Sequence, residues 1–164
     1  MISIADMSLT FKQVYEKIKE KFPDGVASVV ECPGDPYCVV KAESLLAVAG
    51  WLKADPEMQF DLLSCVCGTD DRKNLWSVYH LYSIPKNHKA VLKVQLDREA
   101  PSVPSLVPLW KAADWHERET YDMYGIQYVD HPDLRRILLP EDWPGYPMRK
   151  DYEFPDEYQG IPLK

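Results

Sequence analysis

The side chains best able to do chemistry lie between residues 116 and 138, where acids, histidines and arginines alternate with aromatic rings. Glu117, Glu119 and Asp122 could act as acid and base for a free-standing enzyme. However, no serine or thiol nucleophile stands beside a base, and no glycine loop could cradle a phosphate. The two histidines, His116 and His131, are not at metal-ligand spacing. The stretch therefore favours docking over catalysis.

Other polar residues near this stretch also admit two interpretations. His131 could be a metal ligand or a general base, but a lone histidine before a proline, here Pro132, is more often a hydrogen-bonded structural residue. Arg135 and Arg136 could bind phosphate or acidic lipid, whereas their aliphatic neighbours favour pairing with carboxylates on a protein partner. Arg149 is interpreted in the same way.

The four cysteines, Cys32, Cys38, Cys65 and Cys67, do not form a recognisable cluster site. A cysteine pair separated by one residue lacks the C-x-x-C spacing of zinc and iron–sulfur sites. Residues two apart on a strand share one face, so Cys65 and Cys67 are interpreted as small, buried apolar residues, and the other two likewise.

The composition limits the class of protein. The 164 residues suit one domain, and a net charge of −7 without a basic stripe disfavours nucleic-acid binding. No apolar run approaches the roughly 18–20 residues that span a bilayer, and the first residues do not resemble a signal peptide. We expect a soluble, cytoplasmic product that meets a membrane only through a partner.

Apolar periodicity predicts an α+β domain over residues 1–128. We expect helices and strands in the order helix, two strands, helix, three strands: helices over 11–22 and 43–54, and strands over 26–31, 37–41, 60–68, 75–84 and 90–96. Clean alternation in 90–96 indicates a strand with one buried face. The expected fold has two layers, with helices on one face of a mixed, mainly antiparallel five-stranded sheet.

A third helix is predicted from Asp114 to Tyr124, after three prolines that break the chain. Asp114 can act as its N-cap, Glu117 can complete a capping box, and Gly125 suits the left-handed residue that ends a helix. Because large aromatic residues are interleaved with the charges, we expect Arg118 to be buried and paired with a carboxylate, most simply Asp122 one turn on.

Residues 129–164 combine six prolines with many large apolar residues, so they form neither a long helix nor an ordinary disordered tail. Such a segment either packs on its own domain or lies on a partner, and the latter is the preferred interpretation. Truncation after Val129 is then expected to leave a folded domain that no longer assembles. The proposed partner-binding residues are Arg135, Arg136, Trp143, Tyr146, Arg149 and Tyr152.

Two contiguous motifs carry a family resemblance. Residues 117–126 read Glu-Arg-Glu-Thr-Tyr-Asp-Met-Tyr-Gly-Ile, and residues 131–138 read His-Pro-Asp-Leu-Arg-Arg-Ile-Leu. Together with the segment from Ser102 and the tail from Leu139, they resemble the thirty-kilodalton subunit of respiratory complex I, which is the C subunit of bacterial NADH–quinone oxidoreductase and the J subunit in cyanobacteria and chloroplasts. The matching signature residues are Glu117, Arg118, Glu119, Asp122, Gly125, His131, Pro132, Leu134, Arg136, Ile137 and Leu138. The family usually has glycine where this chain has Asp130, and Asp tolerates left-handed φ better than most residues.

The resemblance implies a peripheral-arm subunit with no catalytic residues, no metal, no flavin and no iron–sulfur cluster of its own. It implies docking on a subunit like the family's forty-nine-kilodalton one, called the large partner below. A subunit like the twenty-kilodalton one, called the small partner, would lie nearby. The expected location is the cytoplasmic face of the inner, plasma or thylakoid membrane.

The resemblance also implies that the chain contributes to electron transfer from NADH to quinone only within the complex. Relatives occur in membrane-bound energy-converting hydrogenases as well, which is the nearest alternative. An adaptor outside electron transport is a further one.

Overall fold

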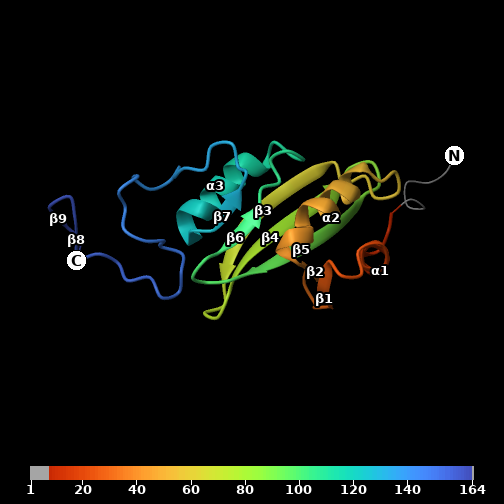
Figure 1. Ribbon diagram of the computed structural model, residues 1–164, viewed down its shortest axis with the longest axis horizontal. Helices are drawn as coiled ribbons and strands as arrows, with labels where there is room; N and C mark the ends of the chain where they lie inside the picture. Colours follow the sequence, from red (N-terminus) through yellow and green to blue (C-terminus); the bar gives the residue numbers. More distant parts are fainter. Residues whose placement is uncertain (1–7, 164) are drawn as a thin grey trace.

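The computed structural model describes residues 8–163, in which three α-helices accompany a mixed five-stranded sheet (Figure 1). This confirms the predicted α+β class. In chain order the elements are α1 (Phe11–Lys21), β1 (Val26–Val30), β2 (Tyr37–Val40), α2 (Ala42–Ala54), β3 (Leu62–Asp70), β4 (Leu75–Ser83), β5 (His88–Leu96), β6 (Ser102–Pro104), α3 (Ala113–Tyr124), β7 (Gln127–Val129), β8 (Glu157–Tyr158) and β9 (Ile161–Pro162).

The large sheet has the strand order β1-β2-β5-β4-β3. β2 and β5 pair in parallel, whereas the other neighbours are antiparallel. Parallel pairing requires a long crossover, and the segment containing α2, β3 and β4 provides it. The strands β3 and β4 pair along their full length, from Leu62 opposite Tyr82 to Asp70 opposite Leu75. β3 is therefore an edge strand, with one side left for other elements.

The core lies between this sheet and the helices. Leu75, Tyr79 and Leu81 lie on one face of β4 and are buried there, in keeping with period-two patterning. They meet apolar side chains of α1, such as Ile18, and of α2, such as Leu45. Thr10 caps α1 through a capping box with Gln13.

The strand predicted over residues 60–68 begins two residues later, at Leu62. Phe60 is buried in the core, and its carbonyl accepts a hydrogen bond from the Trp110 indole N–H at 3.2 Å. Gln59 has φ of 45°, so the chain changes direction just before Phe60. The apolar character of Phe60 therefore reflects a buried loop and not a strand.

A short parallel pair formed by β6 and β7 was not predicted, because each strand has only three residues. The connection between these two strands contains α3, so the segments before and after this helix are held together by the β6–β7 pairing. The Tyr128 hydroxyl in β7 lies 2.9 Å from Ser77 Oγ in β4, which ties this unit to the core. Asp130, directly after β7, has φ of 62°, which agrees with the tolerance expected of Asp at that position.

Beyond β7 the chain runs past the C-terminal end of α3 and ends in β8 and β9, away from the large sheet (Figure 1). Gln159 and Gly160 connect β8 and β9, and both have positive φ. This is the backbone geometry that two-residue hairpin turns favour. The hairpin was also not predicted from the sequence, and it makes the end of this segment more ordered than an extended chain.

Candidate docking site on helix α3 and the C-terminal arm

The start of α3 differs from the prediction. Ala112 is the N-cap and makes no side-chain capping bond, and Asp114 lies inside the first turn. The chain already turns helically before this point, because the Trp110 N–H donates to the Leu106 carbonyl at 2.9 Å. The proposed cap at Asp114 is therefore wrong. At the other end Gly125 has φ of 75° and closes the helix as predicted.

Glu117, expected in a capping box, instead accepts hydrogen bonds from Ser105 Oγ at 2.6 Å and from the Leu106 N–H at 2.7 Å. Burial raises the pKa of this carboxyl to about 7 even though the two donors act to lower it. The charge of Asp114 acts in the same direction as burial. Glu117 thus holds its proton far more tightly than an exposed glutamate.

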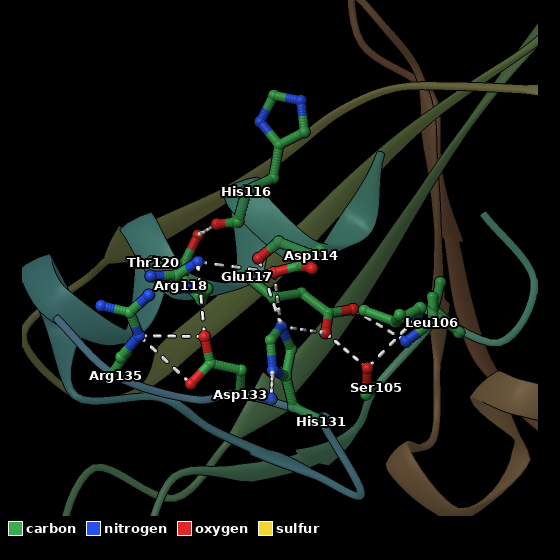
Figure 2. A network of polar contacts seen from close by, with 11 residues as sticks. Ser105, Leu106, Asp114, His116, Glu117, Arg118, Thr120, His131, Asp133 and Arg135 are labelled. Atoms are coloured by element: carbon green, nitrogen blue, oxygen red, sulfur yellow. Dashed lines mark hydrogen bonds and ion pairs between the residues drawn. The ribbon is translucent and has the colours of Figure 1, made fainter. Parts of the chain in front are cut away.

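The His131 ring is fully buried beside Glu117, with Nε2 at 4.0 Å from Glu117 Oε2 and at 3.2 Å from the Asp114 carbonyl oxygen (Figure 2). Its Nδ1 accepts the Asp133 N–H at 3.0 Å, so the hydrogen bonds assign the ring proton to Nε2. His116 points away from this cluster in Figure 2. Because Glu117 and His131 are both shielded from solvent, the pair is suited to holding the chain after β7 against α3.

Arg118 is 4% exposed, which confirms its predicted burial, but Asp122 is not its partner. Its Nη1 lies 3.9 Å from Asp114 and 3.8 Å from Asp133 (Figure 2). Its guanidinium also lies 4.8 Å from the centre of the Trp115 ring. Within residues 8–163, Arg118 Nε has no hydrogen-bond partner. Arg118 is thus buried near two carboxylates at distances longer than a hydrogen bond, and it stacks on the largely exposed indole of Trp115.

Asp122 binds the beginning of the arm, the name used below for residues 129–164. Its Oδ2 accepts the backbone N–H groups of Ile137, Leu138 and Leu139 at 3.0, 2.7 and 3.0 Å. Its Oδ1 accepts from Arg136 Nη1 at 2.9 Å. Burial acts to raise the pKa of Asp122, but the four hydrogen bonds outweigh it and the pKa is lowered. A buried anion therefore fixes the backbone of residues 136–139.

Tyr146 covers the end of α3. A Cβ atom on Gly125 would lie 2.5 Å from Tyr146 Cε2, so only glycine leaves room for the ring. The guanidinium groups of Arg136 and Arg149 lie 5.3 and 5.1 Å from the centre of the same ring. Arg149 Nε also donates to the Tyr124 carbonyl at 2.8 Å. Three of the proposed partner-binding residues thus hold the arm against its own domain.

A second anchor joins the arm to the large sheet. Asp70, at the end of β3, accepts from Arg98 Nη1 at 2.5 Å and from the Lys150 N–H at 2.8 Å. Arg98 also pairs with Asp151. The hydrogen bond from Arg98 is the main reason that the pKa of Asp70 lies well below its usual value. No sequence signal pointed to Asp70 and Arg98, because they lie 28 residues apart and their partners in the arm are 53 and 80 residues away.

The remaining arm residues make a small aromatic cluster. Trp143 packs edge-on to Phe154 and lies 4.9 Å from Tyr158 of β8, measured between ring centres. The Trp143 indole N–H donates to the Tyr152 hydroxyl at 3.0 Å. Arg135, by contrast, is exposed, and within residues 8–163 its one ion pair is with Asp133, two residues earlier. Among the six proposed partner-binding residues, Arg135 is therefore the one left largely free for a second protein.

Within residues 8–163 no group of three or more His, Cys, Asp or Glu side chains could hold a metal ion. Cys38 is buried, whereas Cys65 and Cys67 are half-buried and Cys32 is exposed, so the expectation of four buried cysteines is met in full only by Cys38. Over the same residues, no helix is both long and apolar enough to cross a bilayer.

Comparison with known proteins places these features in one family. A family model described as the respiratory-chain NADH dehydrogenase 30 kDa subunit matches residues 38–158. The C subunit of NADH-quinone oxidoreductase from Roseiflexus sp. (strain RS-1) is 43% identical over 148 residues, covering 88% of this chain and 85% of the relative. The C subunit from Chloroherpeton thalassium is 42% identical over 153 residues, which is 92% of this chain but 64% of the relative.

Two solved structures have the same fold. The trypsin-resistant fragment of Nqo5 has a TM-score of 0.65 and 27% identity, over 75% of this chain and 98% of the fragment. A chain of the membrane-bound sulfane sulfur reductase, an archaeal respiratory membrane complex, has a TM-score of 0.69 over 87% of this chain, but at 22% identity it shows the fold alone. The extent of the family match and the identity to its relatives establish that this chain belongs to the family of the 30 kDa subunit of respiratory-chain NADH dehydrogenase.

Proposed function

We propose that the chain is a non-catalytic, cofactor-free subunit of the peripheral arm of NADH:quinone oxidoreductase, where it docks on the large partner and supports the quinone-reducing module. The observation that carries the proposal is the construction of the arm. Buried polar groups fix its backbone to α3 and β3, yet its side chains Leu138, Met148 and Ile161 remain exposed. An ordered segment that presents large apolar side chains to solvent is suited to a protein partner.

The proposed absence of a cofactor follows from the chemistry of the side chains. An iron–sulfur cluster requires cysteines that converge, whereas Cys38 is enclosed in the core and Cys32 lies on the exposed loop after β1. The raised pKa values of Cys38 and Cys67, caused mainly by burial, disfavour the thiolate form that ligates metals. Flavin, clusters and quinone would then belong to other subunits, including the small partner, on the cytoplasmic face of the membrane.

The six partner-binding residues divide into two roles in this proposal. Arg136, Tyr146 and Arg149 shape the arm from within, and Trp143 and Tyr152 hold its aromatic cluster together. Arg135 is exposed and would contact the large partner directly. Replacement of any of these five residues that hold the arm together would therefore weaken assembly by unfolding the arm. Replacement of Arg135 would weaken assembly without changing the stability of the chain.

Truncation tests the docking role, and the structure determines where to cut. Truncation after Val129 would remove Arg136 and the three backbone donors to Asp122, so we now expect it to destabilise the domain itself. Truncation after Glu153 keeps both anchors and removes only the terminal hairpin with Phe154. We expect this shorter chain to melt within a few degrees of the full chain and to assemble poorly with the purified large partner. Unimpaired assembly would contradict a docking role for the hairpin.

An equivalent subunit of a membrane-bound energy-converting hydrogenase remains the alternative, and the fold shared with the membrane-bound sulfane sulfur reductase chain keeps it open. Isolation of the native complex through a tag on this chain separates the two. A large assembly containing flavin and iron–sulfur clusters supports the NADH:quinone oxidoreductase, and a nickel-containing assembly supports the alternative. A cofactor that remains on the isolated, folded chain would contradict both.

A further inference from the structure

A groove of about 300 Å³ lies where the edge strand β3, α3 and the arm meet. Its lining is mainly apolar and is contributed by all three parts of the chain. The lining residues are Cys67, Gly68, Glu119, Thr120, Met123, Tyr124, Leu138 and Met148. Because α3 packs directly on β3 through Tyr124 and Thr120 against Gly68, the floor of the groove is rigid.

The exposed side chains at this groove are held in place by buried interactions. Leu138 is 61% exposed, yet its N–H and those of both neighbours bind Asp122. Met148 is 53% exposed, while its N–H donates to the Met123 carbonyl at 3.1 Å. The exposure of both residues is thus imposed by the fold and does not arise from a loose loop. A pre-ordered apolar anchor loses little conformational entropy on binding.

One charged side chain lies at the edge of the groove. Glu119 is exposed, and its carboxylate makes no hydrogen bond or ion pair with any residue in the range 8–163. On the same side of α3, one turn earlier, Trp115 is 64% exposed and its ring is fixed by the Arg118 guanidinium. The surface therefore offers large apolar contacts with a single unpaired carboxylate among them.

We infer that this groove binds a segment of the large partner that carries one large aliphatic or aromatic side chain with an arginine or lysine beside it. The apolar side chain enters between Leu138, Met148 and Met123, and the cation pairs with Glu119. The inference rests on the proposed docking function and gives it a site. According to this inference, the main contacts with the large partner are not made by Trp143, Tyr146 and Arg149, because these side chains contact other residues of the same chain.

Binding of the purified full-length chain to the immobilised large partner from the same organism tests the groove. Leu138→Asp and Met148→Asp are each expected to weaken binding about tenfold or more, as replacement of a buried interface anchor does. Ile84→Asp is a matched control, since Ile84 is 62% exposed but lies at the opposite end of the β3–β4 pair. All three variants should keep the melting temperature of the wild type, because each side chain is exposed.

The charge is tested separately. Glu119→Lys should weaken binding more than Glu119→Gln, and the Gln variant should show less dependence of affinity on salt than the wild type. If Leu138→Asp bound the large partner as tightly as Ile84→Asp, the groove would not be the binding site. The docking function would still hold in that case if truncation after Glu153 weakened binding. Failure of the wild-type chain to bind the large partner would overturn both.

Discussion

Helix α3 carries two fully buried carboxylates whose pKa values are shifted in opposite directions. Glu117, near the start of the helix, receives two hydrogen bonds, and burial raises its pKa to about 7. Asp122, near the end, receives four donors, one of them from Arg136, and its pKa is lowered despite burial. Glu117 lies deeper in the protein interior, whereas Asp122 has more donors and one of them is charged, and both differences favour the ionised form of Asp122.

The two carboxylates also hold different parts of the chain. Glu117 binds the turn before α3 and lies beside His131. Asp122 binds residues 136–139, which begin the folded part of the arm. A permanent buried charge is strongly destabilising once its partners are removed, whereas a carboxyl that can keep its proton is tolerated at low pH. Asp122 should therefore matter most for the arm, and Glu117 should make stability depend on pH.

The largest expected effect is that of Asp122→Asn. The amide has a single, uncharged oxygen, so its NH2 group must face either Arg136 or the N–H groups of residues 137–139, and Arg136 is left without its counter-ion. We expect a loss of about 3–5 kcal/mol in the free energy of unfolding, measured by urea denaturation. Glu119→Gln, an exposed carboxylate on the same helix, is the control and should change stability by less than about 0.5 kcal/mol. A loss below about 1 kcal/mol for Asp122→Asn would refute the anchoring role.

The next effect is a pH dependence produced by Glu117. Its pKa of about 7 in the folded chain exceeds the usual value of 4.5, so between these two pH values the folded chain holds a proton that the unfolded chain has released. The stability that this proton contributes is fully present below about pH 4.5 and is lost as the pH rises to about 7. The difference corresponds to about 3 kcal/mol.

Glu117→Gln stays neutral and should abolish this loss. From pH 5 to pH 8 the urea midpoint of the wild type should fall relative to that of the variant. The other polar groups around Glu117 (Asp114, Arg118 and His131) are unchanged in the variant, so they serve as an internal control. Parallel pH profiles of wild type and variant would show that Glu117 is ionised in the folded chain throughout.

The contrast between these carboxylates also marks the limit of inference from the sequence. Local patterns predicted the helices, the five strands of the sheet and the left-handed Gly125, because such signals lie within a few residues of one another. Helix geometry likewise suggested that Arg118 pairs with Asp122. The actual partner of Asp122 is Arg136, which lies 14 residues away and beyond β7.

Contacts that depend on tertiary folding were not accessible in the same way. Burial of Arg118 could be predicted from the surrounding aromatic residues, but the sequence could not show which of several acids would approach it. Asp70 could not be connected with Lys150 across 80 residues without the fold. Glu117 looked like a capping residue because the turn before α3, which recruits it, has no sequence pattern of its own. The arm was proposed from composition, whereas its attachment to α3 and β3 could be seen only in the structure.

The smallest expected effect concerns Gly125, where α3 ends and the arm closes over it. An alanine there must adopt φ near 75°, which costs a residue with a Cβ about 1–2 kcal/mol. The added Cβ would also displace Tyr146 and with it the two guanidinium groups that stack on this ring. We expect Gly125→Ala to lower the free energy of unfolding by about 2 kcal/mol in total.

A double-mutant cycle with Tyr146→Ala separates the two causes. If the ring and the new methyl group collide, Gly125→Ala should be less harmful in the Tyr146→Ala background, where only the backbone strain remains. If the two losses simply add, strain alone explains the glycine and Tyr146 does not press on the helix end. Additivity would weaken the view that the arm packs tightly on α3, whereas coupling of about 1 kcal/mol would place Tyr146 with Asp122 among the groups that fix the arm.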